Sequence, residues 1–185
     1  MAEQNKRIIK DRAIIADDWL LLRPNVSALV SPSVGALPSE VSIPTGKVIV
    51  PLAVWLAQKE ALSARADIGV WLASDERPEA LKDDLARLPL IAVDFPKFSD
   101  GRGYSIAFLL RERLGYAGEL RAIGDVLRDQ LFYLARVGFN AFDVRADRSL
   151  EDALAGLTDF SVRYQTSSDE KEPLFRRVHR PGEVP

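Results

Sequence analysis

Short apolar runs alternate with longer amphipathic stretches along the chain from residue 48 to residue 165. The apolar runs are brief and rich in Val, Ile, Leu and Phe, a composition typical of buried β-strands. The predicted strands are VIV (48–50), IGVWLA (68–73), LIAVDF (90–95), ELRAI (119–123), AFDV (141–144) and FSVRYQ (160–165). The last of these alternates apolar and polar residues, which indicates a half-exposed strand.

Stretches with helical spacing separate these runs. They are LAVWLAQKEALSARA, DERPEALKDDLARL, YSIAFLLRERL, DVLRDQLFYLARV and SLEDALAGL. Pro78 suits the first turn of its helix, and Gly138 stands where a helix ends. Ser149 and Asp152 have the spacing of a capping pair. The pattern therefore predicts six strands and five helices in alternation.

Alternating strands and helices predict an α/β fold with a parallel sheet covered by helices. Two closures fit: an open doubly wound sheet, or a partial or irregular barrel of the TIM type. A full eight-unit barrel takes about 250 residues, and six units are visible here. The N-terminal strands could complete a shortened barrel, so we favour the barrel-like arrangement.

The two ends of the chain do not follow this repeat. Residues 7–23 hold short apolar runs broken by charged pairs, which predicts a β-hairpin or small meander. Residues 24–47 contain four prolines and many small residues, typical of a loop or extended arm. We expect one domain, made of an N-terminal hairpin and arm (1–47), a β/α-repeat core (48–166) and a C-terminal tail (167–185).

Composition narrows the chemistry. The 185 residues include no cysteine, which excludes disulfides, a thiol nucleophile and a cysteine-bound iron–sulfur cluster. The one histidine, His179, stands in a charged, proline-containing tail, so we expect no Ser–His–Asp triad. The formal net charge of −2 gives no electrostatic case for nucleic acid or an anionic membrane. No apolar run is long enough to span a bilayer, and the N-terminus lacks a signal core, so we expect a cytoplasmic protein.

The loop after the third predicted strand, DFPKFSDGRGYS, carries the strongest candidate site. Active sites gather at the carboxyl ends of parallel strands, where Asp94, Lys97 and Asp125 are the candidate catalytic residues. A helix begins after this loop, and its first N–H groups could bind an anion. The predicted anion-binding residues are Lys97, Gly101, Arg102 and Gly103.

Other aspartates would orient this site. Asp100 and Asp125 stand where they could cap helices, and Asp125 could instead orient Arg102 from a neighbouring strand end. Arg128 could form an intrahelical ion pair with Asp125. The alternative for the whole loop is a capped helix with a solvated arginine and lysine. No metal-ligand spacing and no nucleotide-binding fingerprint is present, so the cofactor stays unknown.

The run LPLIAVDFPKFSDGRGYSIAFLLRERLGYAGELRAIGDVLRDQLFYLARVGFNAF (88–142) resembles a bacterial family of unknown function. Its members are described as oxidoreductases associated with sulfite reduction. The likeness extends to RIIKDRAIIADDWLLLR, VPLAVWLAQ and EPLFRR. Sulfite reductase uses sirohaem and a cysteine-held cluster, so a chain without cysteine is not that catalytic subunit.

The resemblance implies an auxiliary protein of sulfite reduction that binds an oxyanion at residues 94–104. Its partner would be sulfite reductase or the electron donor of that enzyme. Two alternatives stay open. One is a non-catalytic scaffold or assembly partner of the reductase, with self-association into a homo-oligomer. The other is a barrel-type enzyme that acts on a small anionic substrate through Asp94, Asp100, Asp125 and Lys97.

Overall fold

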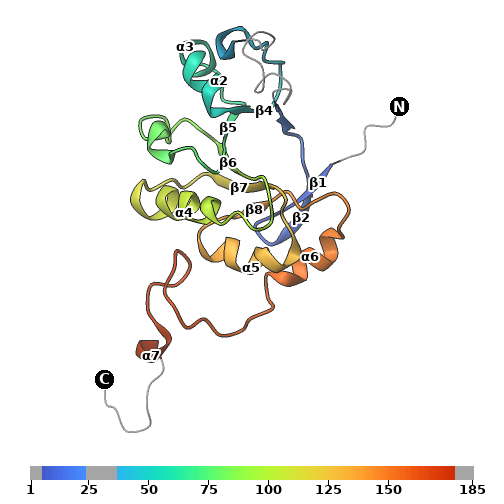
Figure 1. The fold of residues 1–185 in the computed structure, drawn as a ribbon, viewed down its shortest axis with the longest axis vertical. Coiled ribbons are helices and arrows are strands. Elements are labelled where there is room, and N and C mark those ends of the chain that lie inside the picture. Colours follow the sequence, from blue (N-terminus) through green and yellow to red (C-terminus); the bar gives the residue numbers. More distant parts are fainter. Residues whose placement is uncertain (1–5, 24–36, 178–185) are drawn as a thin grey trace.

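A computed structural model describes residues 6–23 and 37–177 and shows one eight-stranded sheet (Figure 1). The strand order is β2-β1-β8-β7-β6-β5-β4-β3. The strands are β1 (Arg7–Lys10), β2 (Ala13–Ala16), β3 (Leu20–Leu21), β4 (Val48–Pro51), β5 (Ile68–Leu72), β6 (Leu90–Phe95), β7 (Glu119–Gly124) and β8 (Ala141–Phe142). Neighbours from β3 to β8 run parallel, whereas β1 is antiparallel to both β8 and β2.

Most helices lie on the outside of the curled sheet, whereas the last one, near the C-terminal end of the described chain, lies apart from it (Figure 1). The helices are η1 (Pro38–Glu40), α2 (Leu52–Ala57), α3 (Lys59–Leu62), η2 (Pro78–Leu81), α4 (Arg102–Phe108), η3 (Leu109–Arg113), α5 (Arg128–Arg136), α6 (Leu150–Gly156) and α7 (Leu174–Arg177). Alternate strand residues such as Val50 and Val93 face these helices in the main core. The residues between them, among them Ile49 and Ala92, form a smaller cluster on the other face.

The chain itself forces the sheet to curl. Strands β2 and β3 are the two edges of the sheet, yet only Asp17, Asp18 and Trp19 separate them. Four Cα–Cα steps of 3.8 Å span at most about 15 Å. In a flat sheet, eight strands spaced about 4.8 Å apart would put the edges roughly 34 Å apart. The sheet is therefore bent into a half-barrel whose two edges approach each other.

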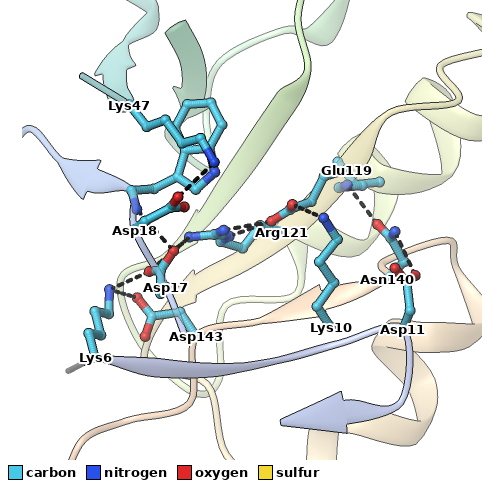
Figure 2. A network of polar contacts seen from close by, with 12 residues as sticks. Lys6, Lys10, Asp11, Asp17, Asp18, Lys47, Glu119, Arg121, Asn140 and Asp143 are labelled. Carbon is cyan, nitrogen blue, oxygen red and sulfur yellow. Dashed lines mark hydrogen bonds and ion pairs between the residues drawn. The ribbon is translucent and has the colours of Figure 1, made fainter. Parts of the chain in front are cut away.

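A network of charged side chains fixes the crossing segment, residues 17–19, inside the half-barrel (Figure 2). The side chain of Asp17 is 0 % exposed and accepts hydrogen bonds from Arg121 Nη1 at 3.0 and 3.1 Å. Arg121, on β7, is also buried and pairs with Glu119 at 2.7 Å. Lys10 pairs with Glu119 at 2.7 Å, so the network links β1, β7 and the crossing segment.

The structure confirms an α/β fold with a curled, mostly parallel sheet, and it confirms the N-terminal hairpin. Five of the six predicted strands form, in chain order from β4 to β8, without the reversal of order that a doubly wound sheet requires. Ser149 caps α6 by accepting a hydrogen bond from the Asp152 N–H. No helix within residues 6–23 and 37–177 is long and apolar enough to cross a membrane.

Two predicted elements are wrong. FSVRYQ (160–165) forms no strand, because it lies beyond β8 with no neighbouring strand to pair with. The predicted helix DERPEALKDDLARL contains only the short 3₁₀ helix η2 and turns. Asp84 within it is buried and accepts a hydrogen bond from Trp55 Nε1 at 3.0 Å, a tertiary contact that the helical spacing does not reveal. Residues 24–36 of the predicted arm and 178–185 of the tail lie outside the described residues.

We predict that replacing Arg121 with Met strongly destabilises the fold. The substitution leaves Asp17 and Glu119 as buried carboxylates without their guanidinium partner, and breaking such a buried pair costs about 3–5 kcal/mol. Urea denaturation of the purified protein measures this loss. Arg7→Met is the matched control, because Arg7 and its partner Glu151 are both exposed and such a pair contributes at most about 1 kcal/mol. Equal losses in the two variants would contradict the role assigned to Arg121.

Candidate functional site

A cleft of about 510 Å³ lies at the carboxyl ends of β6 and β7. It is open to solvent and lies at the end of the half-barrel where parallel β/α folds place their ligands. The residues that line it are Arg23, Asp94, Phe95, Pro96, Gly124, Asp125 and Arg145. The cleft therefore combines two guanidinium groups and two carboxylates at the ends of two central strands.

Each guanidinium in the cleft is held by one of these carboxylates. Arg23 Nη2 lies 2.6 Å from Asp94 Oδ1, and Arg145 Nη1 lies 2.8 Å from Asp125 Oδ1. The arginine side chains are 45 % and 39 % exposed, whereas those of Asp94 and Asp125 are 12 % and 27 % exposed. The better buried aspartates thus orient guanidinium groups that remain in contact with solvent.

Further contacts fix the two arginines. The Arg23 guanidinium lies 5.5 Å from the centre of the Trp71 ring, and Trp71 Nε1 donates to the carbonyl of Leu22 at 3.0 Å. Arg145 also donates to Asp147 from Nε at 2.6 Å and from Nη2 at 3.0 Å. Hydrogen bonds to Asp147 and Asp125 raise the pKa of Arg145 above its ordinary value. These contacts therefore position both guanidinium groups.

The long loop after β6 is fastened to the connection between β7 and α5. Asp125 Oδ2 accepts a hydrogen bond from the Phe98 N–H at 2.9 Å. Gln130 Nε2 donates to the Phe98 carbonyl at 3.1 Å. Asp125 thus has two roles, since it orients Arg145 and also positions the loop that borders the cleft.

Gly124 at the end of β7 lets the two strands meet closely at the floor of the cleft. Its φ of 95° lies in the left-handed region, and a Cβ there would stand 2.4 Å from the carbonyl oxygen of Phe95. The Asp125 N–H donates to that same oxygen at 2.7 Å. A side chain at this position would therefore disturb the cleft and its hydrogen bonds.

The structure divides the predicted site residues into two groups. Asp94 and Asp125 lie in the cleft, and Lys97 is exposed on the neighbouring loop. Arg102 is turned toward Asp100, with Nε–Oδ1 and Nη2–Oδ2 distances of 3.0 and 2.7 Å. Asp125 therefore pairs with Arg145, and not with Arg102 as the sequence suggested.

The remaining predicted residues have structural partners. Asp100 accepts from the Arg102 N–H at the start of α4 and from Ser74 Oγ. A Cβ on Gly103 would stand 2.6 Å from the Phe95 ring, so this glycine permits close packing. Gly101 precedes α4, with open space at its Cβ position. Arg128 pairs with Asp152 and Asp159 and not with Asp125. The residue at the N-cap position of α5 is Leu127, so Asp125 does not cap this helix.

Sequence reasoning did not select Arg23 or Arg145 for the site. Arg145 follows the predicted strand AFDV, and the strand-end rule does include it, but the sequence favours Arg102 as the anion-binding arginine. Arg23 could not be found in this way, because it reaches the cleft only through the crossing of residues 17–19. Within the described parts of the chain, no group of three or more His, Asp or Glu side chains is arranged to hold a metal ion.

Comparison with known proteins adds one match. Residues 69–175, more than half of the chain, match a family of bacterial proteins of unknown function, DUF934. The chain belongs to this family. The match includes Asp94, Asp125 and Arg145, whereas Arg23 precedes it. No curated protein and no solved structure matches the chain.

The pairing of Arg102 predicts a measurable titration shift. Hydrogen bonds from Arg102 and then Ser74 hold the pKa of Asp100 below its ordinary value of 3.8. Arg102→Gln should raise this pKa toward 3.8, as followed by the carboxyl ¹³C chemical shift against pH. Because the folded-state pKa is lowered, the associated stabilisation is present above the unfolded-state pKa and is lost as pH falls through the folded-state pKa.

Arg148→Gln is the control for this titration, because Arg148 pairs with Asp147 and not with Asp100. It should leave the Asp100 titration unchanged. An Asp100 pKa that is the same in the wild type and in Arg102→Gln would show that Arg102 is directed elsewhere in solution.

Proposed function

We propose that the protein binds a small oxyanion in the cleft at the ends of β6 and β7, as an auxiliary protein of sulfite reduction. One observation carries this proposal: Arg23 and Arg145 line the same cleft, and each is aimed by a largely buried aspartate. Planar guanidinium groups with fixed orientation suit the oxygen atoms of sulfite, sulfate or a carboxylate.

The hydrogen bonds leave donors for such a ligand. Arg145 uses one N–H each on Nε, Nη1 and Nη2, so two of its five remain. Arg23 donates only from Nη2 to the described residues. The carboxylates of Asp94 and Asp125 balance the positive charges of Arg23 and Arg145, and Asp147, which also holds Arg145, adds a further negative charge. This balance limits the attraction of the cleft for a dianion. We therefore infer weak binding, with a dissociation constant on the order of 1 mM.

The resemblance to proteins associated with sulfite reduction points to sulfite as the oxyanion. Under this proposal the ligand lies at the carboxyl ends of the parallel strands, as it does in TIM-type barrels. The chain would then hold sulfite for, or deliver it to, sulfite reductase or its electron donor. The absence of cysteine leaves the reduction itself to that partner.

The binding proposal predicts that both arginines are needed. In ¹⁵N-resolved NMR titrations with sodium sulfite, Arg23→Gln and Arg145→Gln should each weaken binding about tenfold or more. This loss corresponds to one charge-assisted hydrogen bond of roughly 1.5–3 kcal/mol. Arg176→Gln is the matched control, since it removes an exposed arginine outside the cleft. Sodium chloride at equal ionic strength controls for screening.

The outcomes separate the candidate functions. Unchanged sulfite affinity in both cleft variants would contradict the proposed site. A second outcome is that the wild type binds sulfite while the Arg145→Gln variant still supports growth on sulfate as sole sulfur source. This outcome would favour the scaffold role, because the cleft would then be dispensable for growth. Turnover of sulfite by the purified chain would favour the barrel-type enzyme.

A further inference from the structure

The C-terminal arm, defined here as residues 158–177, follows α6 and ends in α7. Figure 1 shows it in orange to red, passing below α5 before it reaches α7. Ser167 and Ser168 donate to the carbonyls of Arg136 and Val137 at the end of α5, which holds the middle of the arm against the body. Within the arm, Phe160, Val162 and Tyr164 are 63 %, 62 % and 66 % exposed. They alternate with Ser161 and Arg163, which is the pattern that predicted a strand here. The arm thus has the sequence of a strand but no strand beside it.

Among the described residues, another backbone group bonds to this stretch only at the Tyr164 carbonyl, which accepts a hydrogen bond from the Leu174 N–H at 3.1 Å. None of the N–H groups of residues 160–165 donates to an acceptor in the described parts of the chain. The carbonyls of Arg163 and Gln165 accept from the side chains of Arg177 and Arg136. Those of Phe160 and Val162 accept from no described residue. The edge at Phe160 and Val162 is therefore available to another strand.

We propose that residues 160–164 pair with the same residues of a second copy of this chain. The two segments would form an antiparallel ribbon with a two-fold axis at Val162. The N–H and carbonyl of Val162 would bond reciprocally to those of the partner's Val162.

The sequence of the segment is complementary to itself in this register. Phe160 faces Tyr164 of the partner subunit, which gives an aromatic pair at each end of the ribbon. Arg163 faces Ser161 of the partner subunit, so no like charges lie opposite each other. A parallel pairing in register would instead bring the two Arg163 side chains together. Arg163 pairs with Asp169 of its own chain at 3.0 Å, and the antiparallel register keeps this pair with no second arginine opposite it.

A groove beside the arm supplies the packing that a two-stranded ribbon needs. It has a volume of about 490 Å³ and lies between the arm and α5. Phe132 and Tyr133 of α5 line it together with Phe160, Val162 and Tyr164. The antiparallel two-fold keeps the apolar faces of both segments on one side of the ribbon, where they can cover this groove in both copies.

A charge-reversal pair at the two-fold axis tests this proposal. The wild type should sediment as a dimer in sedimentation-velocity runs at high protein concentration. Val162→Lys and Val162→Glu each place like charges opposite each other, so each should raise the dimer dissociation constant at least about tenfold. An equimolar mixture of the two variants should dimerise again at low salt, because Lys then faces Glu.

Phe175→Lys and Phe175→Glu are the matched controls. Phe175 is an apolar residue of the same arm with 66 % exposure, outside the ribbon. Each control should remain as dimeric as the wild type. Val162 is exposed, so circular dichroism should show the same fold in all chains.

Three results would overturn the proposal. The first is a wild type that is monomeric at every protein concentration tested, which would mean that the edge at Phe160 and Val162 does not pair with a second copy of this chain. The second is a Val162→Lys or Val162→Glu chain that remains dimeric. The third is a mixture of these two variants that stays monomeric. None of these results depends on whether the cleft binds sulfite, so this test is independent of the proposed function.

Discussion

The ion pair between Asp17 and Arg121 is the contact on which the rest of the half-barrel depends. Both side chains are removed from water, and a buried charge is tolerated only with a partner. The crossing segment therefore has one favourable position, with Asp17 against β7. Replacing such a pair with apolar residues often costs little, so its main effect is to specify position rather than to add stability. That position brings the two edges of the sheet together.

The crossing also builds the cleft. Leu20 and Leu22 donate backbone hydrogen bonds to the carbonyls of Lys47 and Ile49, which align β3 along β4. Arg23 follows directly, lies over Trp71 and meets Asp94. The segment after β3 and the β/α core thus each contribute one arginine to the cleft, Arg23 and Arg145. Only the five residues between Asp17 and Arg23 separate the charged network at one end of the half-barrel from the cleft at the other.

Local patterns predicted most of the fold. The apolar runs of β4 to β8 and the capping pair at Ser149 are determined by nearby residues, and the structure confirms them. The strand–helix order left an open sheet and a barrel-like closure as alternatives, and the crossing of residues 17–19 decides in favour of a half-barrel. The buried position of Asp17 was not predictable, because nothing in ADDWLL distinguishes an aspartate aimed into a sheet from one in water. The choice of Arg102 over Arg145 failed to anticipate a local contact, since Asp100, two residues earlier in the chain, turns Arg102 toward itself with two side-chain hydrogen bonds.

The account's central claim is that the crossing segment positions the cleft for an oxyanion, and the sulfite affinity of Asp17→Ala tests it most directly. Asp18→Ala is the matched comparison, because it removes the same charge from the same segment, where Asp18 pairs with Lys47 and is exposed. Circular dichroism should first show that both variants are folded. The sulfite affinity of Asp17→Ala should then be at least about tenfold lower than that of the wild type, and the sulfite affinity of Asp18→Ala should equal that of the wild type. A folded Asp17→Ala protein with wild-type sulfite affinity would contradict the claim.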